Sequence, residues 1–259
     1  MMMTSSTMAD VITPAYQPII DLRTGEALYF EALARATTQQ NHVRLLQFAE
    51  EYGFIHLLDV AMIEHAAHAL AANPRLRIGV NVSVSTIEQF TGPLVSAFFK
   101  VLPLAPRFVV EITETVQIRD RAAVRTFIQA LKAAGAKVAF DDIGDGHFTL
   151  ADIDQFRPHI VKLAAQLFSQ RQERAEELQG VLAVARENGL QVVAEEIDSE
   201  EKRRDCQLLG ISFAQGFLVG GLAPSPGIVA GSAMLDYAAA RVGGRRVVIG
   251  SPGIAARTS

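Results

Sequence analysis

Lys137-Val138-Ala139-Phe140-Asp141-Asp142-Ile143-Gly144-Asp145-Gly146 is the stretch around which the rest of this sequence is interpreted. A short apolar run meets two adjacent carboxylates and then Gly144 and Gly146, which is typical of a buried strand that enters a tight loop. Adjacent carboxylates at a buried strand end repel each other and lose solvation, so a positive group is expected between them. A divalent metal ion would serve, because hard cations bind carboxylate oxygens. Taken alone, however, the stretch fits a solvated, Asp-rich turn better.

The chain repeats this unit once, which favours the metal site. Residues 134–143 align without gaps with residues 188–197, and each copy follows an amphipathic helix pattern. In each copy a Gly at the expected helix end (Gly135 and Gly189) precedes a short apolar strand and an acid pair, which in the second copy is Glu195-Glu196. Repeated helix–strand units predict a parallel sheet with helices outside. Both acid pairs then lie at the carboxyl ends of strands, where barrel enzymes keep their catalytic residues.

Length and composition fit one large α/β domain, although two small domains remain open. The 259 residues match a single (β/α)₈ barrel, which typically has about 250, and a hydrophobic content of 49% is ample for its core. The net charge of −4 gives no sign of nucleic-acid binding. Cys206 is the only cysteine, so no disulfide framework is possible, which fits a reducing compartment.

The sequence carries no clear targeting or membrane signal. No basic residue precedes Arg23, so a secretory leader is not expected, and no apolar run approaches the roughly 18 residues of a transmembrane helix. We therefore expect a soluble, cytoplasmic protein with no nucleic-acid or membrane partner, and we leave a homodimer open. The expected organisation is a flexible segment over residues 1–14, a barrel domain over 15–242 and a flexible tail over 243–259. Helices are expected over residues 42–52, 55–72 and 230–241.

Two other strand patterns bring polar side chains to the face that carries Asp141. Residues 75–83 alternate so that Asn81 lies opposite the apolar face, and residues 107–113 alternate with Glu111 on one face. In a barrel, one face of each strand packs on helices and the other fills the lumen. This parity permits Asn81, Glu111 and Asp141 to face the lumen together near the strand ends, but it does not require it.

Two charged residues in otherwise apolar strand patterns have two interpretations each. Lys162 lies near the end of the strand expected over residues 157–163, and a buried Lys is rare without a partner. A nearby carboxylate cluster would be such a partner, but a strand-end Lys that reaches solvent fits equally well. Glu31 interrupts the apolar run over residues 27–35, and by itself it fits a partnered structural acid better than a metal ligand.

At this point the sequence resembles a known family. The segment Phe30-Glu31-Ala32-Leu33-Ala34-Arg35 resembles the signature of the EAL domain, a phosphodiesterase family that acts on cyclic di-GMP. The resemblance extends from about residue 16 to residue 222 and rests on several separated motifs in the family's order. These are Gln17-Pro18-Ile19, Glu31-Ala32-Leu33 with Arg35, Asn81-Val82-Ser83, Glu111-Ile112-Thr113-Glu114-Thr115, Asp141-Asp142, Lys162, Glu195 and Gln215-Gly216.

The resemblance implies a TIM-like (β/α)₈ barrel whose first strand runs antiparallel to the others. It implies a centre of Mg²⁺ or Mn²⁺, with two ions, which all-oxygen ligation also suggests. It assigns catalytic roles to Glu31, Lys162 and Glu195, substrate contacts to Gln17 and Arg35, and the anchoring of the loop after Asp142 to Glu114. By motif match, the direct or water-linked metal ligands are Glu31, Asn81, Glu111, Asp141, Asp142, Glu195 and Gln215.

The implied chemistry is the hydrolysis of one phosphodiester bond of cyclic di-GMP to give linear pGpG. Two bound metal ions would activate a water and neutralise charge on the phosphoryl group. Lys162 would either hold that water or help to deprotonate it, and the sequence does not distinguish between these roles.

Four departures from the family pattern predict slow turnover. The family loop Asp-Asp-Phe-Gly-Thr-Gly-Tyr reads Asp-Asp-Ile-Gly-Asp-Gly-His over residues 141–147, and the family's Lys-x-Asp ends here in Ala164. The Glu-Gly-Val-Glu-Thr segment is changed over residues 195–199, and Gly220-Gly221-Leu222 replaces the usual Ser-Lys/Arg-Pro. The alternatives to an enzyme are a catalytically weak cyclic di-GMP receptor that signals through a protein partner and, less favoured, a domain that recognises protein only. The presence of Glu31 favours the enzyme.

Overall fold

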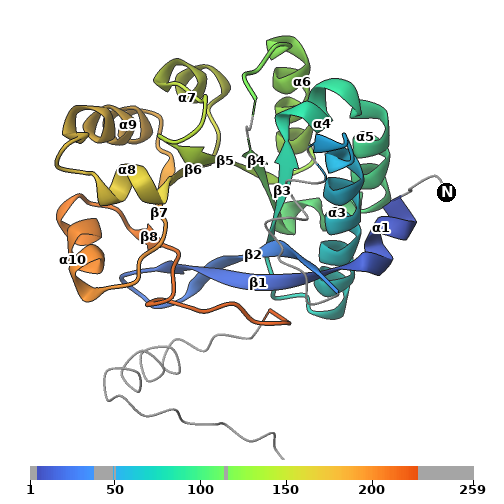
Figure 1. The fold of residues 1–259 in the computed structure, drawn as a ribbon, viewed down its shortest axis with the longest axis horizontal. Coiled ribbons are helices and arrows are strands. Elements are labelled where there is room, and N and C mark those ends of the chain that lie inside the picture. Colours follow the sequence, from blue (N-terminus) through green and yellow to red (C-terminus); the bar gives the residue numbers. More distant parts are fainter. Residues whose placement is uncertain (1–4, 38–48, 50, 114–115, 227–259) are drawn as a thin grey trace, which may run out of the picture.

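A computed structural model describes residues 5–37, 49, 51–113 and 116–226 of the chain (Figure 1). Within these residues, the strands β1 to β8 follow one another in chain order and close into a barrel, as the sequence predicted. The strands are β1 Ile12–Asp21, β2 Ala27–Ala36, β3 Ile78–Ser83, β4 Phe108–Thr113, β5 Lys137–Ile143, β6 Ile160–Leu163, β7 Gln191–Ala194 and β8 Phe213–Ala214.

Among the described residues, helices follow each of β2 to β7, α1 precedes β1, and the helices surround much of the barrel (Figure 1). They are α1 Ser5–Val11, α3 Ile55–Ala72, α4 Val84–Gln89, α5 Thr91–Lys100, the 3₁₀ helix η1 Leu102–Arg107, α6 Arg121–Ala133, α7 Leu150–Phe156, α8 Ala165–Ser169, α9 Ala175–Glu187 and α10 Glu200–Leu208. No helix in the described ranges is both long enough and apolar enough to span a membrane.

The first strand is antiparallel to both of its neighbours, which confirms the expected topology. β1 pairs antiparallel with β2 and with β8, while every other neighbouring pair is parallel. The cause is the short connection between β1 and β2. Asp21 accepts hydrogen bonds from the backbone of Arg23 and Thr24, and Gly25 has a φ of 74°, so the chain reverses at once. The helical connections elsewhere are long enough to return the chain for parallel pairing.

The repeated helix–Gly–strand unit has the predicted local structure. α6 and α9 each end shortly before their glycine, and Gly135 and Gly189 have φ values of 86° and 66°. A left-handed residue after a helix end closes the last turn, and glycine adopts this conformation without steric cost. Each helix then leads directly into the strand that carries an acid pair, β5 and β7.

The amino-terminal segment differs from the sequence prediction. Residues 5–14 are not a flexible lead-in, because α1 forms and β1 begins at Ile12, whose register partner is Ala36. Met8 and Ile12 are buried, and the Ala9 carbonyl lies 3.3 Å from Nε2 of His65 on α3. Apolar residues in the segment thus join the main core. Most of the predicted helix over 42–52, all of that over 230–241 and the tail over 243–259 lie outside the described residues.

The barrel lumen is layered, and this layering positions the site. A buried apolar cluster in the lumen comprises Ile19, Tyr29, Val109, Ala139, Ile160 and Val193. On β2, β4, β5, β6 and β7, the apolar residue lies two positions before a polar residue of the predicted site. The pairs are Tyr29 and Glu31, Val109 and Glu111, Ala139 and Asp141, Ile160 and Lys162, and Val193 and Glu195. Residues two apart on a strand share a face, so a polar layer lies directly next to the apolar layer in the lumen.

On β3, the position equivalent to the apolar layer is Gly79, two residues before Asn81. A Cβ atom there would lie 2.1 Å from Oε1 of Glu111 and 2.7 Å from Cε2 of Tyr29. The absence of a side chain at this position therefore leaves room for the Tyr29 ring and for the Glu111 carboxylate. The missing side chain of Gly79 on β3 thus makes room in the lumen for the large side chain of Tyr29 on β2.

Candidate active site and metal centre

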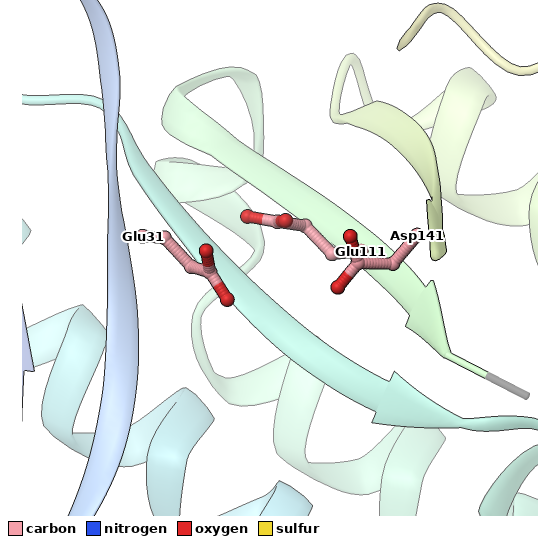
Figure 2. Close-up of side chains that lie close together, drawn as sticks. All are labelled: Glu31, Glu111 and Asp141. Atoms are coloured by element: carbon pink, nitrogen blue, oxygen red, sulfur yellow. The ribbon is translucent and has the colours of Figure 1, made fainter. Parts of the chain in front are cut away.

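The polar layer gathers side chains from successive strands at one end of the barrel. Figure 2 shows the carboxylates of Glu31, Glu111 and Asp141 projecting into the same space from β2, β4 and β5. Asn81 lies on β3, in register with Glu111, while Glu195 and Gln215 directly follow β7 and β8. The strand parity seen in the sequence thus places Asn81, Glu111 and Asp141 together, as it permitted.

Lys162 lies at the centre of this cluster and has almost no access to solvent. Only 1% of the residue is exposed. Its ammonium nitrogen lies close to four carboxylates, at 2.7 Å from Glu111, 2.8 Å from both Asp141 and Glu195, and 3.1 Å from Glu31. Burial lowers the pKa of Lys162, but the charges of these carboxylates outweigh burial and raise it well above its usual value. Lys162 is therefore an ammonium group in the metal-free protein, and its burial shows that the interpretation of a solvated strand end is wrong.

The surroundings shift the pKa values of these carboxylates in different directions. Burial raises the pKa of Glu31, but the charge of Lys162 and hydrogen bonds from Gln215 and Asn81 bring it below its usual value. Burial and the charge of Glu31 raise the pKa of Glu111 well above its usual value. Burial also raises the pKa of Glu195 to about 8. The raised pKa values show that one ammonium group does not offset the burial and mutual repulsion of these carboxylates, a cost that a bound cation would relieve.

Two amide side chains fix the orientation of Glu31. Nδ2 of Asn81 donates to Oε1 of Glu31 at 2.8 Å, and Nε2 of Gln215 donates to Oε2 at 2.7 Å. Nε2 of Gln215 also donates to Oε1 of Gln17 at 3.1 Å, and Nε2 of Gln17 donates to the Gly220 carbonyl. Since Asn81 and Gln215 donate through their nitrogens, their oxygens face the cluster as free acceptors.

Buried oxygen atoms without hydrogen-bond partners show that the donor set fits a divalent metal ion. In the cluster they are Asn81 Oδ1, Glu111 Oε1 and Gln215 Oε1, whereas Glu111 Oε2 and Asp141 Oδ1 are paired with the Lys162 ammonium. Buried polar atoms are normally satisfied, so unpaired oxygens in one small space are a favourable environment for a hard cation.

The acids form two overlapping groups, each of which has the geometry to hold an ion. Glu31, Glu111 and Asp141 form one group, and Asp141, Asp142 and Glu195 form the other. Within each group one oxygen atom per residue lies within 4.8 Å of the others. Asp141 belongs to both groups, which is the arrangement expected of a carboxylate between two neighbouring ions.

The second acid of each pair has a left-handed backbone conformation that the sequence did not predict. Asp142 has a φ of 55° and Glu196 a φ of 50°. Such values are uncommon for residues other than glycine, and among the described residues the third is Arg157, at the end of α7. The two acid pairs therefore match in backbone conformation as well as in residue type. The sequence repeat showed that both pairs are acidic, but an acidic side chain does not by itself predict a positive φ.

A cavity of about 460 Å³ lies over the cluster and has a size that suits a small-molecule ligand. Gln17, Glu31, Asp141, Lys162, Glu195 and Gln215, all predicted site residues, line it. Five further lining residues were not among the predicted site residues. These are Leu33, Glu196, Asp198, Gly216 and Phe217, of which Phe217 is 63% exposed. An aromatic residue directly after Gln215-Gly216 was the signal that could have marked Phe217.

Two predicted substrate or loop residues are not brought into this lining. Arg35 is half-buried further along β2, and its Nη1 donates to the Ala34 carbonyl at 2.9 Å. Burial lowers the pKa of Arg35, and the charge of Glu31 opposes this effect. Glu114, the predicted loop anchor, lies outside the described residues. Arg174 anchors this loop in the described structure, because its Nη2 donates to the Gly144 carbonyl at 2.6 Å.

A second cavity of about 430 Å³ lies beside the second acid group. It is lined by Asp142, Asp145, Ala164, Ala165, Gln166, Ser169, Glu195 and Glu196. Two of the departures from the family pattern, Asp145 and Ala164, thus lie at one side of the candidate metal centre. Asp145 adds charge there, and its field contributes to raising the pKa of Asp142 to about 6, after burial and the charge of Asp141.

Comparison with known proteins identifies the family. The model of the EAL domain matches residues 5–221, and the chain belongs to this family. The chain is 27% identical over 217 residues to the cyclic di-GMP phosphodiesterase PdeF of Escherichia coli, a match that covers 79% of this chain and 29% of PdeF. It is 30% identical over 224 residues to the cyclic di-GMP phosphodiesterase PA2567 of Pseudomonas aeruginosa, covering 79% of this chain and 37% of that protein. The chain therefore spans well under half of the length of these relatives.

Solved structures share the fold. The c-di-GMP-bound form of a standalone versatile EAL protein from Vibrio cholerae superposes with a TM-score of 0.69 at 22% identity, covering 85% of this chain and 96% of the other. A manganese and cyclic di-GMP complex of BlrP1 from Klebsiella pneumoniae superposes with a TM-score of 0.70 at 24% identity, covering 82% of this chain and 56% of the other. At these identities the likeness establishes the barrel fold.

Proposed function

We propose that this protein is a metal-dependent phosphodiesterase that hydrolyses cyclic di-GMP to linear pGpG. The observation that carries the proposal is the convergence of carboxylate and amide side chains and one buried ammonium group at one end of the barrel, next to a cavity of about 460 Å³. Membership of the EAL family and the names of its phosphodiesterase relatives support the same reaction. Because this chain spans only part of those relatives, the activity is proposed for the barrel domain and its own residues.

The ligand set suits Mg²⁺ or Mn²⁺, with two ions as the favoured number. Glu31, Asn81, Glu111 and Asp141 would hold one ion, and Asp141, Asp142 and Glu195 the other, with Gln215 acting through its free oxygen or through water. When bound, such ions supply an activated water and neutralise charge on the phosphoryl group. The BlrP1 structure is a manganese complex, which supports the choice of ion.

The protein's own residues hold the reactants in place. In the reaction, a water oxygen forms a bond to phosphorus while one ester P–O bond breaks and its oxygen is protonated. Lys162 lies among the carboxylates, so its side-chain nitrogen would lie beside the attacking water. This position suits both roles that the sequence left open, which are holding the water and helping to deprotonate it. Asn81 and Gln215 keep the Glu31 carboxylate in its orientation while charge develops.

The test is the hydrolysis of cyclic di-GMP by the purified chain, followed by chromatographic detection of pGpG. Activity is expected with Mg²⁺ or Mn²⁺, its loss with a chelator, and its return when metal is restored. Glu31→Ala should remove activity while the far-ultraviolet circular dichroism is unchanged, since a site carboxylate is usually a cost to stability. Full hydrolysis in verified metal-free buffer would contradict the proposal.

A catalytically weak receptor is the second candidate, and the departures beside the metal centre favour it. Ala164 is 2% exposed and offers no carboxylate, while Asp145 adds a negative charge to the same cavity. A receptor would bind cyclic di-GMP tightly and leave it intact in the presence of Mn²⁺. Binding by calorimetry and product formation by chromatography, measured on the same sample, separate the two functions.

A further inference from the structure

A third cavity lies on the face of the barrel opposite to the carboxylate cluster. Its volume is about 410 Å³, and its lining comes from the start of β2 and from the residues that precede β3 and β4. In parallel strands these positions lie at the amino-terminal end of the barrel, whereas the candidate active site lies at the carboxyl end. The cavity is lined by Ala27, Leu28, Tyr29, Phe30, Pro74, Arg75, Leu76, Arg77, Pro106 and Arg107.

Three of these lining residues are arginines, and none has a carboxylate partner in the part of the chain that the structure describes. Arg75 and Arg77 are exposed and flank the buried Leu76, just before β3. Nη1 of Arg107 donates to the carbonyls of Leu70 and Asn73, at 2.8 and 2.9 Å, so this guanidinium is held in place. Its remaining donors are available, because these two bonds involve one nitrogen only.

Positive charge continues from the cavity along the same end of the barrel. Burial and the charge of Arg77 both lower the pKa of Lys137, at the start of β5. Burial followed by the charges of Lys132 and Lys137 lowers the pKa of His159, just before β6, and its Nδ1 accepts a hydrogen bond from the Val138 N–H, so this imidazole is neutral and the positive charge comes from the lysines and arginines. Like charges that lower each other's proton affinity are a cost to the folded state unless an anion offsets it. In a chain with a net charge of −4, this concentration of cations is a local feature.

We infer that this cavity binds a small phosphate-bearing anion. Guanidinium groups recognise phosphate through paired N–H donors, and three of them around one cavity can surround a single phosphate or diphosphate. The volume lies within the range of small-molecule sites, and Pro74 and Pro106 restrict the backbone next to Arg75 and Arg107. A free phosphate compound and a phospholipid headgroup share this chemistry, so the two sources require separate binding assays.

The inferred site is independent of the proposed phosphodiesterase activity. The cavity shares no lining residue with either cavity at the carboxyl end. Tyr29 is among the residues that line the basic cavity, and its ring lies beside Gly79, next to the Glu111 carboxylate. Tyr29 thus contacts both ends of the lumen, but the two sites have no charged residue in common.

The test is calorimetric titration of the metal-free full chain with inorganic pyrophosphate, in low salt and with a chelator present. Saturable binding is expected, and Arg75→Gln with Arg77→Gln should weaken it by about tenfold or more, because hydrogen bonds to charged groups are lost. The control is Arg125→Gln on the exposed face of α6, which removes one positive charge as each substitution in the double variant does. It should leave pyrophosphate binding unchanged.

A second arm uses vesicles of phosphatidylcholine with and without a phosphatidylinositol phosphate, in a sedimentation assay. Vesicle binding that the double variant abolishes, together with weak pyrophosphate binding, assigns the site to a lipid headgroup. Pyrophosphate binding with no vesicle binding assigns it to a free phosphate compound. Absence of both kinds of binding in the unaltered protein, or equal binding by the double variant with a normal circular dichroism spectrum, overturns the inference.

Discussion

The two acid-pair units have the same backbone geometry but are held in place by different means. In both units the Ile carbonyl accepts a backbone hydrogen bond, from the Ala164 N–H at Ile143 and from the Leu218 N–H at Ile197. In the first unit, Leu167 also packs on Gly144 and Arg174 donates to the Gly144 carbonyl. In the second unit, the Ile197 N–H donates to the Gln215 carbonyl, and Nζ of Lys202 donates to the Glu196 carbonyl. Similar placement of carboxylates therefore does not require a similar supporting structure.

The largest effect is expected between the acid that both groups share and an acid of the second pair that belongs to neither group. Asp141 belongs to both acid groups, whereas Glu196 is exposed and belongs to neither. Asp141→Asn should lower turnover by on the order of 10²–10³-fold or more and weaken Mn²⁺ binding, because a ligand shared by both groups is lost. Glu196→Gln should change turnover by less than about tenfold. Steady-state kinetics and Mn²⁺ calorimetry on both variants check this, and equal losses would remove the distinction.

The supporting structures should differ in their response to an added methyl group. Gly216 has a φ of 152°, and a Cβ atom there would lie 2.3 Å from the Ile197 backbone nitrogen. Gly144 has a φ of 100°, and its Cβ would instead lie 2.5 Å from a side-chain carbon of Leu167. Gly216→Ala should cost about 3 kcal/mol or more of unfolding free energy, because backbone cannot move aside.

Gly144→Ala should cost about 1–3 kcal/mol, since a side chain can adjust. Urea denaturation of the metal-free protein measures both costs. Leu167→Ala should recover part of the loss in Gly144→Ala, as the two residues are in contact. A loss in Gly144→Ala that Leu167→Ala leaves unchanged would show that its backbone conformation, and not the packing of Leu167, causes the loss.

The helices that follow the two acid units should differ in their response to acid. α7 begins with a capping box in which Thr149 and Asp152 bond each other, and Asp152 also pairs with Arg121. α10 begins with Ser199, whose side chain accepts from the Lys202 N–H. Burial raises the pKa of Asp152, but the bonds from Thr149 and Arg121 bring it below its usual value of 3.8. A lowered pKa stabilises the folded state above pH 3.8, and this contribution is lost as pH falls through the folded-state pKa.

Asp152→Asn should therefore lower the unfolding free energy by about 1 kcal/mol at neutral pH, with a difference that shrinks below pH 3.8. Ser199→Ala should cost a similar amount at every pH, because a hydroxyl does not titrate. Thermal unfolding of the three proteins between about pH 3 and 7 tests this contrast. A constant difference for Asp152→Asn over the whole range would mean that Asp152 acts without its charge.

The smallest effect is expected at Ala164. The family's Lys-x-Asp motif has a carboxylate at this position, but Lys162 in this chain already contacts four other carboxylates. A loss of turnover of about 10²-fold is expected when a catalytic group is displaced by about 1 Å, and these contacts prevent such a displacement of the Lys162 ammonium group. Ala164→Asp should therefore raise turnover by less than about tenfold, as measured by single-turnover hydrolysis with saturating Mn²⁺. A larger rise would show that Lys162 is poorly placed in the parent protein.

The strand patterns and the repeated unit made most of this fold predictable. The alternation around Asn81 and Glu111 and the acid at Asp141 permitted one shared lumen layer but did not require it. The role of Gly79 was not predictable, because it depends on the distance between the Tyr29 ring and the Glu111 carboxylate from neighbouring strands. Helix α1 was missed because the burial of Met8 and Ile12 depends on packing with distant residues. Likewise, the contact of Arg174 with Gly144 joins residues 30 positions apart.

The antiparallel first strand also determines when the barrel can be completed. Its closing edge pairs Ile20 with Ala214 and Asp21 with Phe213, residues nearly the whole described length of the chain apart. A growing or truncated chain that lacks β8 cannot form this edge, and it also lacks the Gln215 amide that orients Glu31. Loop closure over such a distance is slow, so closure of the barrel and completion of the polar layer are expected to coincide late in folding. Amide hydrogen exchange should accordingly be fastest, among the barrel strands, along this short edge.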